Sequence, residues 1–311
     1  MGTLSDEHIP DRFNLAPLGV WTPALEFVPA SRAAELAAEL EEAGYGAIWI
    51  PEVAGRDVFA HLTMLLSATR RLVGATGIAS IWARDAVAMT GGVQALTEAF
   101  PERMLLGLGV SHGNLVSGLR GHSYERPLAT MRAYLDAMDA APYTSFRPTT
   151  PVRRILAALG PKMLALSAER SQGAHTYFVP PEHTVTAREV LGERPLLCVE
   201  QAVVLETDPK VARHVARSHT ATYLALPNYT SNLRREGFAE GDFANAGSDR
   251  LVDAIVAWGD LDQIRARVQA QFDAGADHVC VQVLSAAPRE VPEAGWRTVA
   301  DALAGLGPTA A

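Results

Sequence analysis

Residues 155–180 read ILAALGPKMLALSAERSQGAHTYFVP, and this stretch contains one complete unit of a pattern that recurs along the chain. An apolar strand ends at Gly160-Pro161, a helix follows it, and a second strand ends at Pro180. Because only short turns separate the three elements, we expect the two strands to be parallel and to form a βαβ unit. At the start of such a helix, free backbone N–H groups and the positive end of the helix dipole can hold an anion.

The same alternation of strands and helices runs along the rest of the chain. Short apolar runs predict eight strands, at residues 15–21, 47–51, 72–81, 104–110, 152–159, 174–179, 196–205 and 277–284. Helical spacing predicts further helices at residues 29–43, 57–69, 85–100, 125–140, 209–224 and 261–274. Eight parallel strands separated by amphipathic helices favour a single α/β domain built as a closed (β/α)8 TIM barrel, with an open doubly wound sheet as the alternative.

Two segments depart from this rhythm. Residues 226–247 are rich in Asn, Arg, Gly and Phe, and they lie between the helix after the seventh strand and the eighth strand. We expect an insertion before the eighth strand that lies over the barrel mouth, where Asn228 and Tyr229 would offer polar contacts to a substrate. The second segment, residues 113–122, is expected to be a loop.

Composition limits the classes of function. The 311 residues are 48% hydrophobic, with a formal net charge of −8 and no run of Lys or Arg, which argues against a nucleic-acid surface. No apolar run is long enough to span a membrane, and the start MGTLSDEHIPDR lacks the core of a signal peptide, so we expect a cytoplasmic protein. Cys198 and Cys280 lie in apolar strands and are interpreted as buried, reduced thiols.

In a barrel of this kind, function gathers at the carboxyl ends of the strands. Glu52 follows the second strand and could accept a hydrogen bond, act as a base or cap the next helix. His112 follows the fourth strand, where a neutral imidazole can exchange a proton near neutral pH. Both residues could equally be structural. The sequence GPKM at residues 160–163 is consistent with an anion-binding helix start or with a plain one.

Other local patterns are weaker. Residues 109–113, GVSHG, match the GxSxG of a hydrolase nucleophile elbow, but a loop is expected after Gly113 and no triad partners of Ser111 can be assigned. The GxG of Gly107 and Gly109 lacks the third glycine of a dinucleotide site, so tight packing explains it better. No His spacing typical of a metal site occurs. A sugar-phosphate enzyme using Lys162 and a hydrolase using Ser111 stay open as alternatives.

Ordered blocks of sequence carry a family resemblance. They are LGVW (18–21), ELEEAGYGAIWIPE (39–52), ATGIASIWARDA (75–86), ERMLLGLGVSH (102–112) and ALGPKMLALSAERSQGAHTYFVPPEHT (158–184), followed by GSDRLVDAIVAWGD and DAGADHVCVQVL. No single block is diagnostic, but the ordered set is specific and spans most of the chain. The chain resembles the bacterial luciferase-like superfamily, within its branch of deazaflavin (coenzyme F420)-dependent oxidoreductases.

The resemblance implies a (β/α)8 barrel that holds a flavin-type ring in its mouth. It implies hydride transfer between coenzyme F420 and a small organic substrate, because deazaflavin has carbon where flavin has its reactive nitrogen. An FMN-dependent monooxygenase and a flavin-binding protein without turnover are the alternatives. The resemblance also implies a homodimer, which we expect to pair through the Ala-rich face of residues 33–43 and through the helix at 57–69.

The site residues implied by the resemblance lie at strand ends. A non-proline cis peptide is expected within Ala79-Ser80-Ile81, His112 is assigned as the acid or base, and Glu52 is assigned to ring or substrate contact. Phosphate contacts are expected after the fifth and sixth strands. The implied cofactor contacts are Trp21, Ser80, Ile81, Leu159, Gly160, Met163, Ala174, His175, Thr176 and Tyr177.

Overall fold

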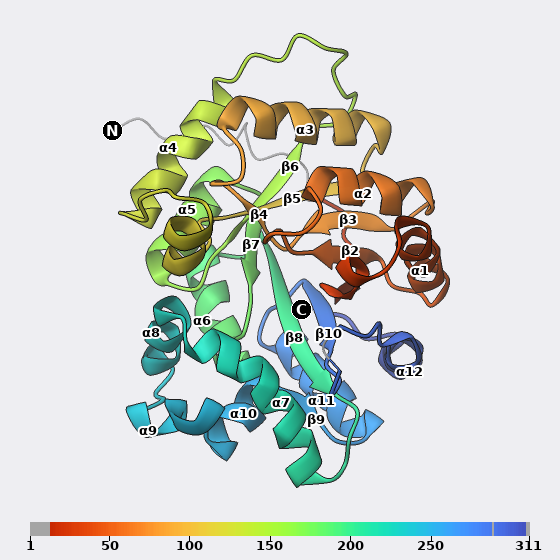
Figure 1. The fold of residues 1–311 in the computed structure, drawn as a ribbon, viewed down its shortest axis with the longest axis vertical. Helices are drawn as coiled ribbons and strands as arrows, with labels where there is room; N and C mark the ends of the chain where they lie inside the picture. The colour runs from red at the N-terminus through yellow and green to blue at the C-terminus, as the bar shows by residue number, and fades with distance from the viewer. Residues whose placement is uncertain (1–12, 288, 309–311) are drawn as a thin grey trace.

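Eight parallel strands close into a barrel in the computed structural model, which describes residues 13–287 and 289–308 (Figure 1). The last barrel strand, β10 (His278–Val283), pairs with both β1 (Leu18–Trp21) and β8 (Leu196–Val204) and so closes the sheet. This closure confirms the predicted (β/α)8 barrel and excludes the open sheet. The barrel strands are β1 (Leu18–Trp21), β2 (Ala47–Ile50), β3 (Val73–Thr76), β5 (Met104–Gly109), β6 (Arg153–Ala157), β7 (Gly173–Thr176), β8 (Leu196–Val204) and β10 (His278–Val283).

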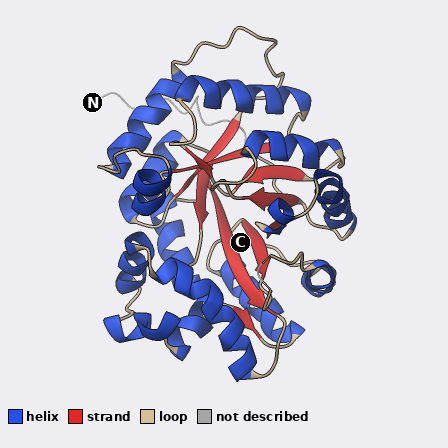
Figure 2. Cartoon of the chain, in the orientation of Figure 1, coloured by secondary structure: helices blue, strands red, loops and turns tan. Residues whose placement is uncertain are grey.

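Helices form a layer around the outside of the strands (Figure 2). Asp57 and Asp85 begin two of them as predicted, since each carboxylate accepts a hydrogen bond from a backbone N–H of the first turn. Two helices, α6 and α12, were not predicted. The outer elements are the 3-10 turn η1 (Ala24–Phe27), α1 (Ala30–Glu42), α2 (Val58–Ser67), α3 (Ala86–Ala99), α4 (Pro127–Asp139), α5 (Pro161–Arg170), α6 (Pro181–Leu191), α7 (Pro209–Leu224), α11 (Leu261–Asp273) and α12 (Glu293–Leu303).

The third predicted strand is interrupted. β3 ends at Thr76, the peptide bond between Gly77 and Ile78 is cis, and the short β4 (Ala79–Ser80) then pairs with β5. The predicted non-proline cis peptide after the third strand is therefore present, but it precedes the predicted position within Ala79-Ser80-Ile81, and that position was wrong. Gly77 packs closely beneath a side chain from β1, because a Cβ at this residue would lie 2.6 Å from Trp21 Nε1.

The interior of the barrel is filled by side chains. Trp49 stacks on His175 with ring centroids 4.6 Å apart, and its Nε1 donates to His278 Nε2 at 2.9 Å. Cys198 and Cys280 are buried here without a disulfide, as predicted. Glycines permit close strand packing, as expected, since a Cβ on Gly107 would lie 2.1 Å from the backbone oxygen of Thr76.

The two irregular segments contain helical turns. The predicted insertion holds α8 (Pro227–Arg235), α9 (Glu240–Phe243) and the 3-10 turn η3 (Ala244–Ala246). They are followed by α10 (Asp249–Ile255) and by β9 (Ala257–Trp258), an unpredicted strand that pairs with β8. The predicted loop at residues 113–122 was wrong, because Asn114–Leu119 (η2) forms a π-helical turn.

Three expectations concern the surface and the ends of the chain. No helix among the described residues is both long enough and apolar enough to cross a bilayer. Ala33 and Ala37 are buried within the chain, whereas Ala34 and Ala38 of the same helix are partly exposed, so the pairing surface stays a prediction. The homodimer itself stays a prediction. The start MGTLSDEHIPDR lies outside the described residues.

Candidate active site

The barrel mouth carries paired charges at the ends of β2 and β4. The Glu52 carboxylate accepts a hydrogen bond from the backbone N–H of Ser80 at 2.9 Å and forms a two-point ion pair with Arg84. The side chains of Glu52 and Arg84 are only 6% and 11% exposed. Arg84 also contacts Asp57 at 2.7 Å. Because these partners engage both carboxylate oxygens, Glu52 ties the strand end of β2 to that of β4.

Trp21 joins this cluster from β1. Its Nε1 donates to the backbone oxygen of Gly77 at 3.0 Å, and its ring centroid lies 5.0 Å from that of Tyr177. Ser80 and Ile81 are buried at the adjacent strand end. The structure thus brings together Trp21, Glu52, Ser80 and Ile81, as the strand-end argument predicted.

His112 lies just beyond β5, where its ring is partly buried. Its Nδ1 is 3.1 Å from Asn228 Oδ1 on α8. An amide oxygen can only accept, so Nδ1 carries the proton and Nε2 bears the lone pair. Burial lowers the pKa of His112, with a smaller opposing effect of the Asn228 hydrogen bond. The imidazole is therefore neutral at pH 7 and can accept a proton at Nε2.

Aromatic side chains form the other side of the mouth, at β7, α7 and α8. Tyr177 donates its hydroxyl to Gln282 Oε1 at 2.8 Å, so its oxygen accepts from the Tyr223 hydroxyl at 2.7 Å. The Tyr229 ring lies 5.5 Å from His112 and 5.1 Å from Tyr223. Burial raises the pKa of all three tyrosines, so this side is uncharged at neutral pH.

A carboxyl group lies inside the barrel beneath these rings. Glu200 on β8 is 2% exposed, and its Oε2 accepts from the backbone N–H of Phe178 at 3.3 Å. Among the described residues, its Oε1 has no hydrogen-bond partner. Burial raises the pKa of Glu200 to about 8, so the group is protonated at neutral pH. We did not predict Glu200, whose one signal is an acid within the apolar run LLCVEQAVV.

A cationic cradle forms where α8 meets the start of α5. Arg235 Nη2 lies 3.5 Å from the position that a Cβ on Gly160 would take, and it donates to Asn232 Oδ1 at 2.7 Å. Asn232 is 1% exposed, yet its Nδ2 donates to no described residue. His183 bonds the Leu159 carbonyl through Nε2, which leaves Nδ1 without a described partner. Arg235 and the free Asn232 amide thus add donors to a helix start, as an anion requires, whereas the neutral His183 presents only a lone pair at Nδ1. Neither Asn232 nor Arg235 was predicted.

Other predicted contacts lie deeper. Ala174, His175 and Thr176 form part of β7 and are buried, with His175 stacked on Trp49 inside the barrel. Their buried side chains leave the backbone as the group that could contact a ligand, so their assignment stays a prediction. Met163 is partly buried against the core on the outside of the barrel. Of the residues at the end of β7, Tyr177 extends into the aromatic cluster.

The arrangement of the described side chains supports neither a hydrolase triad nor a metal site. Ser111 has a left-handed backbone (φ 57°), and its carbonyl accepts from the Tyr124 hydroxyl at 3.1 Å. No described side chain forms a hydrogen bond with its hydroxyl, so no triad is assembled. Within the described residues, no cluster of three His, Cys, Asp or Glu side chains is arranged to hold a metal ion.

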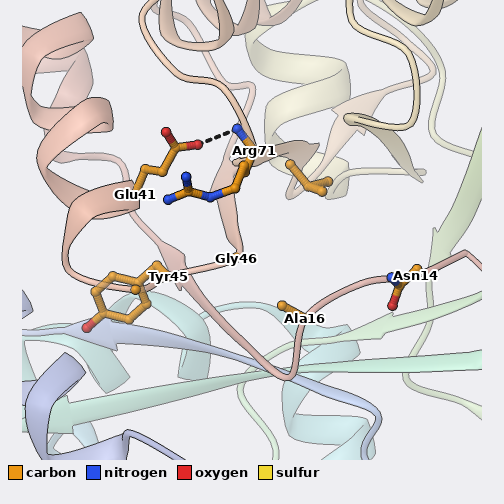
Figure 3. Close-up of a pocket in the computed structure, with 8 residues that line it drawn as sticks. Asn14, Ala16, Glu41, Tyr45, Gly46 and Arg71 are labelled. Atoms are coloured by element: carbon orange, nitrogen blue, oxygen red, sulfur yellow. Dashed lines mark hydrogen bonds between the residues drawn. The ribbon is translucent and has the colours of Figure 1, made fainter.

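A separate pocket of about 350 Å³ opens at the amino ends of the strands (Figure 3). It is lined by Asn14, Ala16, Glu41, Tyr45 and Arg71, among others. The Glu41 carboxylate accepts hydrogen bonds from consecutive backbone N–H groups that precede β3. Because catalytic groups in such barrels gather at the opposite, carboxyl ends of the strands, we interpret this pocket as a structural hollow.

Comparison with known proteins identifies the family. Residues 13–278 match the family described as luciferase-like monooxygenase. The chain belongs to this family. The match confirms the resemblance drawn from the sequence blocks and places the chain among luciferase-like oxidoreductases. A Mycobacterium tuberculosis protein named "Putative coenzyme F420-dependent oxidoreductase Rv3520c" is 27% identical to the luciferase-like chain, over 86% of this chain and 94% of that protein.

Solved structures share the luciferase-like fold. An F420-dependent secondary alcohol dehydrogenase in complex with an F420-acetone adduct superposes with a TM-score of 0.74 at 14% identity, covering 93% of this chain and 99% of that one. The oxygenating constituent of 3,6-diketocamphane monooxygenase from Pseudomonas putida, in complex with FMN, has a TM-score of 0.70 at 14% identity, with 93% and 96% covered. Luciferase-like barrels thus include proteins with either cofactor.

Proposed function

We propose that this luciferase-like protein is an F420-dependent oxidoreductase that transfers a hydride between the deazaflavin and a small organic substrate. The observation that carries the proposal is a neutral His112 at the barrel mouth, with its Nδ1 proton engaged by Asn228 and a lone pair on Nε2. Such a group suits the proton transfer that accompanies hydride transfer. The relative named as a putative coenzyme F420-dependent oxidoreductase supports the choice of cofactor.

The cationic cradle fits an acidic cofactor tail. Arg235 lies above Gly160, Asn232 has an unused amide donor, and the exposed Lys162 is in the first turn of α5. We assign these residues to the phosphate of the tail, because a buried donor without a partner favours an acceptor at that place. Trp21, Ser80 and Ile81 would line the ring. When bound, deazaflavin supplies a carbon atom that takes up or releases a hydride.

The chain's own groups supply the remaining chemistry. His112 Nε2 accepts the proton that the substrate releases during oxidation and returns it during reduction. The aromatic side of the mouth excludes water and keeps the surroundings uncharged. Glu52 is bound by Arg84 and by the Ser80 N–H. In our proposal it therefore holds the ring-side backbone in place and does not act as a base.

The cofactor is tested by titrating the purified protein separately with F420 and with FMN and following quenching of ring fluorescence. We expect saturable binding of F420. Arg235→Ala should weaken that binding about tenfold, because it removes a charge-assisted contact. Arg234→Ala is the matched control, since this neighbouring arginine pairs with Glu240 on the surface.

FMN remains the alternative cofactor, because an FMN-bound monooxygenase shares the fold. Tight binding of FMN without binding of F420 would overturn the choice of deazaflavin. Equal loss of F420 affinity in the Arg234 and Arg235 variants would instead show that α8 contributes only general positive charge, and the cradle would then be wrong.

A further inference from the structure

We infer that Asn228, on the insertion helix α8, is a positioning residue for His112: its side-chain oxygen holds the imidazole as the tautomer with the proton on Nδ1. The tautomer can be tested without turnover. Its consequence for the reaction rests on the proposed function. The luciferase-like barrel would thus complete its base with a residue from a segment that lies outside the βα repeat.

Two consecutive residues of α8 hold the imidazole. Asn228 Oδ1 accepts from His112 Nδ1 at 3.1 Å, and the Tyr229 ring packs against the imidazole at 5.5 Å with an angle of 42° between the planes. Tyr229 is itself buried among Phe178 and Tyr223. The hydrogen bond therefore comes from a helix that is anchored in the core.

The hydrogen bond decides which nitrogen is the base. The proton position of a neutral imidazole is set by the partner of the other ring nitrogen. No other described residue bonds either nitrogen of His112, so Asn228 alone determines the tautomer within that part of the chain. Loss of this acceptor would leave the proton free to move to Nε2, and the nitrogen assigned as the base would then be a donor.

No charged group competes with this control. The side chains that face His112 from α8 are Asn228 and the neutral phenol of Tyr229. At the neighbouring strand ends, Glu52 and Arg84 neutralise each other. Two influences therefore act on the protonation of the His112 ring: burial, which favours the neutral form, and the Asn228 hydrogen bond. A change at residue 228 should therefore be visible in the titration of His112.

The same helix reaches the cofactor cradle at its other end. Arg235 lies above Gly160, while Asn228 holds His112, and α8 has only nine residues. A displacement of α8 would therefore disturb both the proposed base and the proposed tail site. For this reason the test needs variants that remove the hydrogen bond and leave the helix in place.

The experiment is nitrogen-15 NMR of the histidine side chains in ligand-free protein, with His112→Gln used to assign the signals. Wild type should show a protonated Nδ1. Asn228→Asp keeps an acceptor and adds negative charge, so it should retain this tautomer and raise the pKa of His112. Asn228→Leu removes the acceptor and should release the proton to Nε2. Ser231→Leu, at an exposed site on the same helix, is the control. Unchanged His112 signals in both Asn228 variants would overturn the inference.

Activity measurements separate the inference from the proposed function. With a substrate that wild type turns over, Asn228→Leu should lower kcat about tenfold and leave F420 affinity unchanged. The loss of kcat is smaller than that expected when the general base itself is removed. Asn228→Asp should shift the acidic limb of the pH–rate profile to higher pH, because it raises the pKa of His112. If the tautomer changes as expected but wild type turns over no substrate with F420, the proposed function fails and the inference stands. Should Asn228→Leu unfold, Asn228→Ala replaces it.

Discussion

The two sides of the barrel mouth are buried to a similar degree, but one side buries paired charges and the other buries neutral polar groups. At β2 and β4, Glu52 and Arg84 keep full charges and neutralise each other in a two-point ion pair. At β7 and α7, Tyr177 and Tyr223 are neutral and bond through their hydroxyl groups, above a protonated Glu200. The charged side therefore fixes backbone geometry, whereas the aromatic side provides surroundings without charge.

The difference explains where proton transfer is best placed. A proton moves most readily where no fixed charge traps it, and His112 is held by groups of the uncharged side, Asn228 and Tyr229. On the charged side, Arg84 and the Ser80 N–H engage both oxygens of the Glu52 carboxylate, so this group holds the strand ends together. Substitutions on the charged side should therefore lower mainly the stability of the fold, whereas loss of His112 should lower mainly the rate of the reaction.

The largest effect is expected from Arg84→Met, which breaks the charged side. It leaves the Glu52 carboxylate buried without its partner, and removal of one member of a buried pair typically costs about 3–5 kcal/mol. Urea denaturation should show this loss in the free energy of unfolding. Arg132→Met is the control, because its pair with Glu169 is 46% and 54% exposed and should contribute little to stability. Equal losses in both variants would mean that the Glu52 pair is not effectively buried.

His112→Ala tests the uncharged side through the reaction. Loss of the general base should lower kcat/KM about 100-fold and leave F420 affinity unchanged. His122→Ala is the control, since this exposed histidine of the same segment only packs against Trp82. If His112→Ala retains full activity, the assigned base is wrong. Absence of turnover in wild type as well would favour a binding protein.

Glu200→Gln tests the buried carboxyl through pH. The folded state holds a proton on Glu200 up to about pH 8, whereas the unfolded chain loses it near the ordinary value of 4.5, so stability falls as pH rises through this window. Between pH 7 and 8 the wild type should lose about 1 kcal/mol in the free energy of unfolding. Glu200→Gln keeps an acceptor for the Phe178 N–H and should remove this dependence.

The pH range above 7 and a control variant separate the effect of Glu200 from those of other groups. His175 and His278 are buried and His219 is partly buried. Burial lowers their pKa values to about 4, 4 and 3, respectively, so they contribute an opposite dependence below their ordinary value of 6.5. Above pH 7 they are neutral in both states. Glu193→Gln, at an exposed site, should retain the wild-type dependence. A dependence that persists in Glu200→Gln would assign the proton to another group.

Single hydroxyl deletions test the aromatic side through stability alone. Tyr177→Phe removes the hydroxyl that bonds both Gln282 and Tyr223, and it should cost about 1–2 kcal/mol in thermal or urea unfolding. Tyr229→Phe should cost less than about 0.5 kcal/mol, because no described residue bonds its hydroxyl. The reverse order would show that the Tyr177 hydroxyl pair does not stabilise the fold.

The barrel could be predicted because its signal is local and repeated. Each short apolar run marks a strand, and the carboxyl ends of parallel strands meet on one face, which placed Trp21, Glu52, His112 and Tyr177 at the mouth. The run from Ala174 to Tyr177 shows the limit of this argument. Neighbouring side chains on a strand point to opposite faces, so a run assigned as a whole contains side chains that do not face the barrel interior.

The remaining site residues could not be predicted, because they depend on long-range placement. Asn228 and Arg235 lie in an insertion with no strand or helix repeat to fix its position. The pairing of Arg84 with Glu52 depends on how two loops meet. Glu200 resembles a solvent-facing acid until the register places it inside the barrel beside Cys280.

The closure of the barrel by β10 has a consequence for synthesis on the ribosome. β1 lacks one of its two neighbours until residues 278–281 emerge, and the Trp49–His278 hydrogen bond joins positions 229 residues apart. A nascent or truncated chain that ends before β10 exposes unpaired edges on both β1 and β8, and open edges are templates for aggregation. C-terminal truncation should therefore be far more harmful to yield than its small loss of mass suggests.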